Sequence, residues 1–415
     1  MLRKRVVPFR LLAAVSLLSL AFTQPSQTAA PQAKTPMLLG VNYYTPLWRD
    51  NERALLGFLP LGIVRWGGNS SDTSDNPVGL VQRFVSETRA INHAEPLYQV
   101  PFLYETPDEA AQELKSVNID SNLGIKYWEI GNEPELFQAS HHSSITVDDY
   151  VKGWRTDAQA MLAADPSITL VGPDVSLNIT SDYESSRAWQ WFTTFLKANG
   201  DMVKVVTLHF YPYGSEDLTP DQIFANADVF AKNIAQIQAY IHDTLKRDVP
   251  LMINEINLSY VSGGSTKANP SGLFAGLWLA DIIGKAAQQG VAAVIPWTAT
   301  RNGGLGILDD NGNPHPTYYA IHAFSGLGSS VDTPSGLPAG LIGYHSQGDS
   351  DEAIEVLINT TAQPISLSVG GKSITLGEYS VTRLHLDASG KLADGQSYGQ
   401  KEFDAQSGPS DVVSG

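Results

Sequence analysis

Cysteine is absent from this 415-residue sequence. Its absence excludes a disulfide framework, a catalytic thiol and a cysteine-based zinc site. Folding without disulfides, if the chain is exported, suits a bacterial periplasm or exterior better than a eukaryotic secretory route.

Positive charge is scarce, with 27 Lys and Arg against 43 Asp and Glu and a formal net charge of −16. Four of the basic residues lie before residue 11, and removing them from the −16 leaves −20. Such a surface repels polyanions, so nucleic acid and highly sulfated glycans are poor partners. Uncharged or lightly charged substrates fit better, and nothing in the sequence indicates an oligomeric state.

A long hydrophobic run is also missing. The apolar stretch from Leu11 to Phe22 follows Arg3, Lys4, Arg5 and Arg10, and is shorter than the roughly 20 residues that a membrane span needs. Residues 1–30 therefore read as a cleaved signal peptide. We expect a secreted or periplasmic protein that has no membrane contact once the signal is removed.

Sequence motifs of several other enzyme classes do not occur. No G-x-G-x-x-G follows a strand candidate, which disfavours dinucleotide binding. No H-E-x-x-H zinc motif and no G-x-S-x-G nucleophile elbow is present either. We expect neither a cofactor nor a metal.

Eight short apolar runs alternate with helical patterns between residues 37 and 328, which predicts parallel strands joined by crossover helices. Eight such units in this length are typical of a (β/α)₈ TIM barrel, an α/β fold. Thr106 and Thr219 each begin a capping box with Pro at the first helical position. The strand candidates are Leu38–Tyr43, Ile63–Trp66, Pro96–Pro101, Ile125–Gly131, Ile168–Gly172, Val205–Phe210, Pro250–Asn254 and Val291–Pro296.

A change of pattern near residue 328 predicts a second domain. Helical periodicity stops there, and five β runs follow, which favours a C-terminal antiparallel β-sandwich over residues 329–390. Residues 391–415 are rich in Gly, Ser, Gln and Asp, so we expect a flexible tail. The β candidates are Gly340–His345, Ala353–Asn359, Ile365–Val369, Ser373–Leu376 and Ser380–His385.

Two of the predicted barrel strands end in a carboxylate. Strand four leads into Asn132 and Glu133 within WEIGNEPELF, and strand seven leads into Glu255 within LMINEINLSY. The C-terminal ends of barrel strands form the active face, so the two carboxylates should face each other across one pocket. Cleavage of a glycosidic bond needs such a pair, and retaining enzymes hold the two groups roughly 5 Å apart. Asn132 could bind the 2-hydroxyl of the sugar.

These segments resemble glycoside hydrolase family 79, the heparanase and β-glucuronidase family of clan A. The resemblance rests on WEIGNEPELF, on IVRWGGNSSD at strand two, on TLHFY at strand six, on Glu255 with its following loop, and on NPHPTYYAIHAFSGLG after strand eight. It implies that Glu133 is the acid/base, that Glu255 is the nucleophile and that Asn132 binds the sugar. It also implies that His209 and Tyr211 lie beside the nucleophile.

The resemblance further implies how a uronic acid would be recognised. In relatives that act on uronic acids, backbone amides of a glycine pair and a tyrosine hold the substrate carboxylate, and Gly263, Gly264 and Tyr318 are the matching candidates here. Val261 and Ser262 separate Tyr260 from the glycines, a departure from the family pattern that bears on uronate specificity.

Three more residues are expected at the pocket because of their places at strand ends. Trp297 ends strand eight and could lie under a sugar ring, while Arg65 and Asn69 close strand two. The sequence thus indicates an exported retaining β-glycoside hydrolase, β-glucuronidase-like in the first instance. The alternatives are a clan A β-glycosidase or α-L-arabinofuranosidase for neutral sugars, or a non-catalytic carbohydrate-binding barrel.

Overall fold

The structure is a computed structural model that describes residues 36–44, 47–74, 76–177, 182–263, 266–348 and 351–412. All of these belong to one compact unit, residues 32–415. The predicted signal peptide lies outside the described residues.

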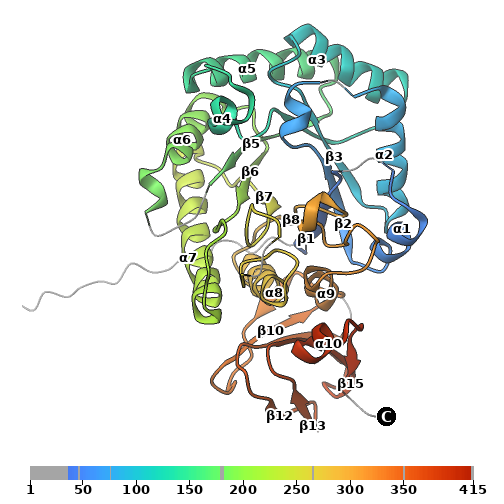
Figure 1. Ribbon diagram of the computed structural model, residues 1–415. Coiled ribbons are helices and arrows are strands. Elements are labelled where there is room, and N and C mark those ends of the chain that lie inside the picture. The colour runs from blue at the N-terminus through green and yellow to red at the C-terminus, as the bar shows by residue number, and fades with distance from the viewer. Residues whose placement is uncertain are drawn as a thin grey trace, which may run out of the picture. The chain divides into compact units, whose positions relative to one another are not determined.

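Eight parallel strands close into a barrel in which each strand pairs with the next along the chain (Figure 1). The ring closes where Leu38 and Leu39 of the first strand pair with Ala293 and Val294 of the last. The predicted (β/α)₈ fold is therefore confirmed. The strands are β1 (Leu38–Asn42), β2 (Leu61–Trp66), β3 (Glu95–Val100), β4 (Tyr127–Ile130), β5 (Thr169–Ser176), β6 (Val205–Phe210), β7 (Leu251–Ile256) and β8 (Ala293–Pro296).

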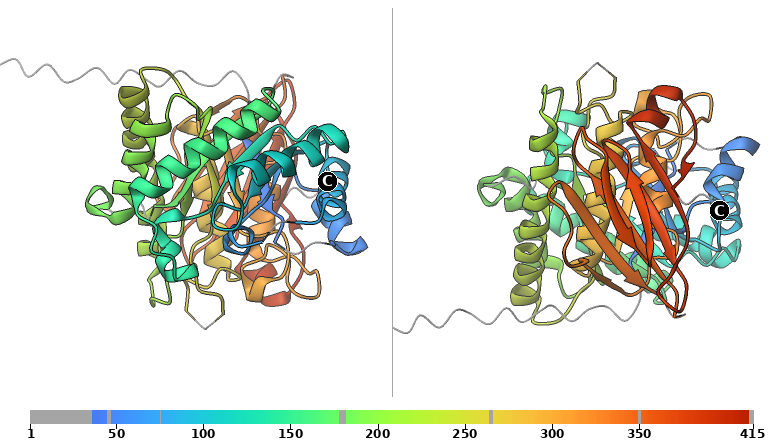
Figure 2. Two further views of the ribbon diagram at one scale, coloured as in Figure 1. Left: turned by 90° about the horizontal axis from the view of Figure 1, so that it is seen from above. Right: turned by 90° about the horizontal axis from the view of Figure 1, so that it is seen from below.

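Helices surround the barrel and cover the outer face of its strands (Figures 1 and 2). Thr106 and Thr219 accept hydrogen bonds from the N–H groups of Glu109 and Gln222, so both predicted capping boxes are present. The helices are α1 (Asp50–Leu56), α2 (Val78–Ala90), α3 (Pro107–Leu114), α4 (Phe137–His141), α5 (Val147–Ala164), α6 (Arg187–Asn199), α7 (Pro220–Leu245), α8 (Leu273–Gln288) and α9 (Pro316–Ala323).

The strands bury apolar side chains on both faces, as parallel strands under helices must. Inside the barrel, Ile63, Leu97, Val171 and Ile295 belong to one cluster that fills the space between the strands. A second, larger cluster lies between the strands and the helices. The interior is thus packed, and the polar groups gather at the C-terminal ends of the strands.

The chain continues into an antiparallel six-stranded sheet of order β16-β15-β14-β11-β10-β9, with a separate β12–β13 hairpin. One face of the sheet contributes Tyr344 and Val356 to the large barrel cluster, and the other packs against the hairpin. The predicted C-terminal β-sandwich is confirmed. The elements are β9 (Ser330–Asp332), β10 (Leu341–Gln347), β11 (Ala353–Asn359), β12 (Ile365–Val369), β13 (Lys372–Leu376), β14 (Ser380–Leu386), β15 (Leu392–Gly399), α10 (Gln400–Ala405) and β16 (Ser410–Asp411).

The prediction of a flexible tail from residue 391 is wrong. β15 pairs with β14 along its whole length, from Leu392 opposite Leu386 to Gly399 opposite Ser380. The segment is polar, but a strand that packs on one face needs few apolar residues, and Leu392 and Tyr398 supply them. The polar composition of residues 391–399 therefore gave no sign of β15, which the backbone hydrogen bonds to β14 hold in place.

The barrel and the sheet meet at α8. Tyr344 of β10 donates its hydroxyl to the Asp281 carboxylate and, at 3.2 Å, to the Asp281 carbonyl oxygen. Gly284 lies one turn further along α8 and faces the Tyr344 ring, which leaves no space for a larger side chain. The right-hand view of Figure 2 shows the sheet on this side of the barrel.

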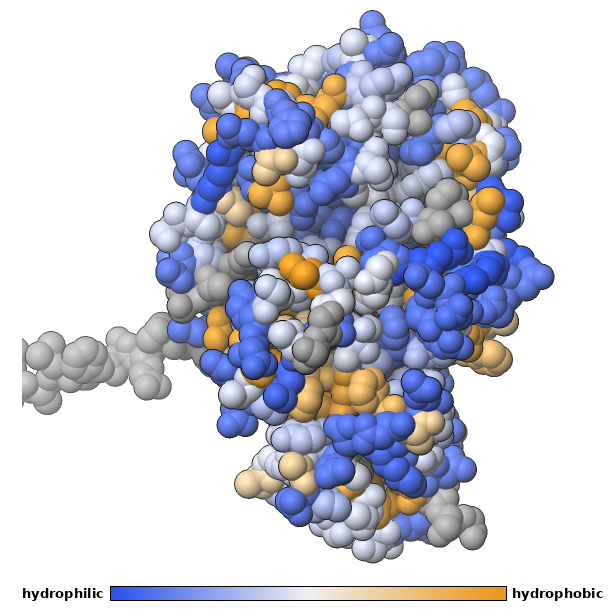
Figure 3. Space-filling model, in the orientation of Figure 1, coloured by the Kyte–Doolittle hydropathy of each residue, from blue (hydrophilic) through white to orange (hydrophobic). Residues whose placement is uncertain are grey.

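Among the described residues, no helix combines the length and the apolar character that crossing a membrane requires. The surface in Figure 3 is mostly hydrophilic, and its hydrophobic residues form small separate patches.

Candidate active site

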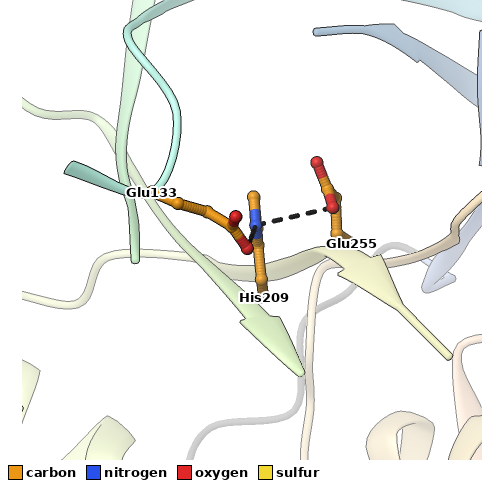
Figure 4. A group of neighbouring side chains, drawn as sticks. All are labelled: Glu133, His209 and Glu255. Carbon is orange, nitrogen blue, oxygen red and sulfur yellow. Dashed lines mark hydrogen bonds and ion pairs between the residues drawn. The ribbon is translucent and has the colours of Figure 1, made fainter. Parts of the chain in front are cut away.

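Three side chains converge where β4, β6 and β7 end. Nδ1 of His209 lies 3.0 Å from Oε1 of Glu133 and 3.6 Å from Oε2 of Glu255 (Figure 4). One polar atom of each of the three residues lies within 4.8 Å of the others. All three side chains are buried, so the two carboxylates expected from the sequence do meet, with an imidazole beside them.

Arg65 on β2 binds the Glu255 carboxylate and fixes its position. Its side chain is fully buried, and Nη1 donates to Oε1 of Glu255 at 2.6 Å, while Nη2 donates to Oδ1 of Asn132 at 2.8 Å. Nη1 also donates to Asn42, and Nε donates to both oxygens of Glu129. The sequence placed Arg65 among substrate-binding residues. The structure instead makes it a support of Glu255 and Asn132, because every nitrogen of its guanidinium already has a partner in the protein.

Tyr211 supplies a second donor to the same carboxylate. Its hydroxyl donates to Oε2 of Glu255 at 2.6 Å. Burial, followed by the charge of Glu255, raises the pKa of Tyr211 well above its usual value, so the phenol keeps its proton. Glu255 thus accepts one hydrogen bond on each oxygen, and both donors favour its ionised form.

Glu133 has an unusual backbone conformation. Its φ of 46° and ψ of 55° lie in the left-handed region, which a residue with a side chain rarely adopts. Gly131, two residues earlier, has a φ of 78°. A Cβ at this position would lie 2.9 Å from the Cβ of Phe102, so only glycine fits. The Glu133 N–H donates to the carbonyl oxygen of Asp174 on β5 at 3.0 Å. This turn aims the Glu133 side chain toward His209 and the barrel axis (Figure 4).

A second polar layer lies under the carboxylates, and sequence reasoning missed it. Nδ2 of Asn254 donates to Oε1 of Glu129 at 2.6 Å and to Oδ1 of Asp174 at 2.5 Å, and all three residues are fully buried. Burial raises the pKa of Glu129 well above its usual range, although Arg65 opposes the shift. A signal was present in the sequence, because Glu129 interrupts an apolar strand. A carboxylate buried there is stable only if a charged or hydrogen-bonding partner compensates for the water that it loses.

Asn132 and Asn69 lie beside Glu133. Nδ2 of Asn132 donates to Oδ1 of Asn69 at 2.9 Å, which fixes the orientation of both amides. Asn132 is buried and Asn69 is exposed. Asn69 therefore lies at the surface, with its side-chain oxygen bound to the residue that precedes Glu133.

Trp297 follows β8 and is partly buried. Its ring centroid lies 5.5 Å from that of Tyr44, which is 43% exposed, in an edge-to-face contact. Gly68 packs against the other side of the indole, where a Cβ would approach within 2.7 Å of the ring. The structure thus places two aromatic rings, Tyr44 and Trp297, after the ends of β1 and β8.

Of the residues expected to bind a uronate, Tyr318 does not lie at the carboxylates. It lies on α9, and its hydroxyl donates to the carbonyl oxygen of Leu55 on α1 at 2.9 Å, so its assignment to the site is wrong. The resemblance to the family pointed to a tyrosine that this chain places in the outer helical layer. Tyr260 is 61% exposed, and Gly263 lies on the same exposed loop. Gly264 lies outside the described residues.

The cluster of Glu133, His209 and Glu255 also has the composition of a metal site. Glu255, however, directs Oε1 to the Arg65 guanidinium and Oε2 to the Tyr211 hydroxyl. A cation at this position would lie against the positive charge of Arg65 and would displace both hydrogen bonds. The arrangement fits catalytic carboxylates better than metal ligands.

Comparison with known proteins found no matching family model. The chain is similar to heparanase from Rattus norvegicus, at 26% identity over 236 residues, which are 54% of this chain and 42% of the relative. Heparanase from Mus musculus is 26% identical over 206 residues, or 48% of this chain and 36% of the relative. The chain thus matches less than half the length of these relatives.

Among solved structures, an α-L-arabinofuranosidase from Thermotoga maritima in complex with arabinose has a TM-score of 0.64, with 16% identity, 89% of this chain and 94% of that chain covered. A family 51 α-L-arabinofuranosidase from Bifidobacterium longum has a TM-score of 0.66, with 15% identity and 92% and 93% covered. The chain is therefore similar to the heparanases in sequence and to family 51 arabinofuranosidases in fold, which confirms the resemblance to clan A glycoside hydrolases that its motifs indicate.

Proposed function

We propose that the protein is a retaining β-glycoside hydrolase in which Glu133 is the acid/base and Glu255 is the nucleophile. The observation that carries the proposal is that one carboxylate oxygen of Glu133 lies within 4.8 Å of one carboxylate oxygen of Glu255. Retaining glycosidases hold the two carboxyl groups roughly 5–5.5 Å apart, whereas inverting enzymes separate them by about 6.5–9.5 Å to admit a water molecule. The close approach of the two carboxylates supports the retaining mechanism.

The surroundings of the two carboxylates support different roles. Glu255 accepts hydrogen bonds from Arg65 and Tyr211, two donors that stabilise a carboxylate, as a nucleophile requires. Glu133 accepts from neither of them, and its side-chain partner is Nδ1 of His209 at 3.0 Å. Glu133 is therefore the group suited to giving and taking a proton.

In the first step, an oxygen of Glu255 attacks the anomeric carbon while Glu133 donates its proton to the departing oxygen. The bond from the anomeric carbon to that oxygen breaks, and a glycosyl ester on Glu255 forms. In the second step, Glu133 removes a proton from water, the water oxygen attacks the anomeric carbon, and the Glu255 carboxylate leaves. Arg65 and Tyr211 stabilise the negative charge that Glu255 regains.

Two classes of glycone compete for this site. The motifs shared with the β-glucuronidase family favour a β-glucuronide. The charge of the loops that follow the strands favours a neutral sugar, because they carry eleven Asp or Glu residues and three Lys or Arg residues. Two of those three, Arg49 and Arg301, form ion pairs with Glu52. A β-glycosidase or α-L-arabinofuranosidase for neutral sugars is therefore the second candidate. A purely sugar-binding barrel is disfavoured because both carboxylates are present.

A panel of p-nitrophenyl glycosides tests the proposal. The panel comprises the β-glucuronide, β-glucoside, β-galactoside, β-xyloside and α-L-arabinofuranoside, with Glu255→Gln as the control variant. Turnover of one member that the control abolishes supports the mechanism and identifies the glycone. Turnover of similar rate in wild type and Glu255→Gln contradicts the assignment of the nucleophile.

We also propose that the protein is exported after cleavage of residues 1–30, on the basis of the basic and apolar segments of that stretch. Expression of the full chain in a Gram-negative host, with mass spectrometry of the periplasmic fraction, tests this. A mature N-terminus near residue 31 is expected. Retention of Met1 in all of the protein contradicts the proposal.

A further inference from the structure

A buried Asp–His pair lies beside Glu133, and the mechanism above makes no use of it. Asp72 ends the short 3₁₀ turn Asn69–Asp72 in the loop after β2, and its side chain is fully buried. Nε2 of His141, at the end of α4, lies 3.5 Å from Oδ2 of Asp72. The His141 side chain is 12% exposed, so water reaches only one edge of the pair.

Asp72 connects the loops that follow three consecutive strands. Its Oδ1 accepts from Nε2 of Gln99 on β3 at 3.0 Å, and its carbonyl oxygen accepts from the N–H of Leu103 at 3.1 Å. Oδ1 of Asp72 also lies 3.5 Å from the position that a Cβ on Gly131 would occupy. The Asp72 carboxylate thus faces the backbone at the end of β4, immediately before Asn132 and Glu133.

The backbone at Glu133 needs such contacts. A residue with a side chain rarely adopts the left-handed conformation, which persists only where the surrounding structure holds it. The N–H of Glu133 donates to the carbonyl oxygen of Asp174 at 3.0 Å. At the preceding residue, Arg65 and Asn69 bind the side chain of Asn132, and Asp72 faces its backbone. Asp72 is therefore the anchor of the peptide unit that leads into Glu133.

We propose that Asp72, paired with His141, is a positioning residue that aims the Glu133 carboxyl at the leaving oxygen. The proposal rests on the proposed role of Glu133 as acid/base. It predicts that loss of the Asp72 charge loosens the turn at Asn132 and displaces Glu133, while Glu255, which Arg65 and Tyr211 hold, keeps its place.

Burial opposes the charge of Asp72, and its neighbours support that charge. Burial raises the pKa of Asp72 to about 7, with Glu133 adding to the rise and His141 and the Asn132 N–H opposing it. Tyr150 on α5 also feels the charge of Asp72. Because little water reaches Asp72, its charged form depends on His141 and Asn132. Asp72 therefore links the loop after β2 to the segment after β4.

The test compares Asp72→Asn with wild type on a series of aryl glycosides of the preferred sugar, from 2,4-dinitrophenyl to 4-methylphenyl. Positioning of the acid matters most when the leaving group is poor. We expect kcat/KM for the 4-methylphenyl glycoside to fall roughly 10- to 100-fold, within the range that general acid catalysis contributes, and that for the 2,4-dinitrophenyl glycoside to change less than about 3-fold.

Asp157→Asn is the matched control. Asp157 is also a buried aspartate whose pKa burial raises to about 7, but it lies within α5. It should leave the whole series unchanged. An equal loss on good and poor leaving groups in Asp72→Asn, or no loss on either, overturns the proposal.

Two further variants keep the outcomes distinct. If Asp72→Asn does not fold, His141→Gln carries the test, since its side chain touches solvent; a smaller change with the same leaving-group dependence is expected, and a flat response overturns the proposal. Glu133→Ala must show the steepest leaving-group dependence of all. If it does not, the proposed function itself fails, whatever Asp72→Asn does.

Discussion

Arg65→Gln is the substitution for which the structure makes its strongest prediction. The guanidinium is fully buried and contacts two carboxylates, Glu255 at 2.6 Å and Glu129 at 2.7 Å. Removing one partner of a buried ion pair costs about 3–5 kcal/mol, because it leaves an uncompensated charge in a medium of low polarity. Since folded domains are stable by only about 5–15 kcal/mol, we expect a large fall in the free energy of unfolding.

The loss should depend on pH in a defined direction. Without Arg65, the pKa of Glu129, which burial already raises, rises further, so the folded state binds its proton more tightly than the unfolded chain does. A folded state that binds more protons loses stability as the pH rises, by about 1.4 kcal/mol per pH unit for each proton. The deficit relative to wild type should therefore be smaller at pH 5 than at pH 8.

Urea unfolding followed by tryptophan fluorescence at pH 5 and pH 8 measures both effects. Arg155→Gln is the control, because Arg155 pairs with Asp201 at 2.6 Å on the surface, where such pairs contribute about 0–1 kcal/mol. A loss below about 1 kcal/mol in Arg65→Gln, or a deficit that shrinks as the pH rises, would refute the view that one buried cation supports this layer.

Three other variants give simpler expectations. Tyr211→Phe removes the 2.6 Å hydrogen bond to Glu255, so kcat/KM should fall roughly 10- to 100-fold in steady-state assays on the preferred aryl glycoside. Burial raises the pKa of Asp157 from 3.8 to about 7, so wild type loses up to about 4 kcal/mol as the pH rises from 4 to 8, and Asp157→Asn should lose less in urea titrations at the two pH values. Gly284→Ala places a Cβ against the Tyr344 ring, and calorimetry should show a loss of about 1–3 kcal/mol; an unchanged Tm would contradict the packing described here.

The sequence predicts those features that depend on local pattern. Each barrel strand is an apolar run with a helix after it, and Glu133 and Glu255 stand out because polar residues at strand ends belong to the active face of a barrel. In the second layer only Glu129 stands out in the sequence, as a charged residue within an apolar strand. Its partners do not show there, because Arg65, Glu129 and Asp174 come from different strands and meet only when the barrel closes.

Two errors have the same origin. Residues 391–399 are too polar to indicate a strand, yet β14 offers a complete row of backbone partners to them. Tyr318 lies in a motif shared with a family, but α9 carries its hydroxyl to Leu55 in the helical layer. In both cases, a contact distant in sequence decided the outcome.

The contact between Tyr344 and Asp281 also bears on how the protein is made. α8 leaves the ribosome before β10 does, so the barrel is synthesised with an apolar helix face, notched at Gly284, that only a later segment covers. Until β10 arrives, the buried Asp281 has Lys285 as its partner but not the Tyr344 hydroxyl. The sheet therefore completes the packing of α8 only after the whole barrel has been synthesised.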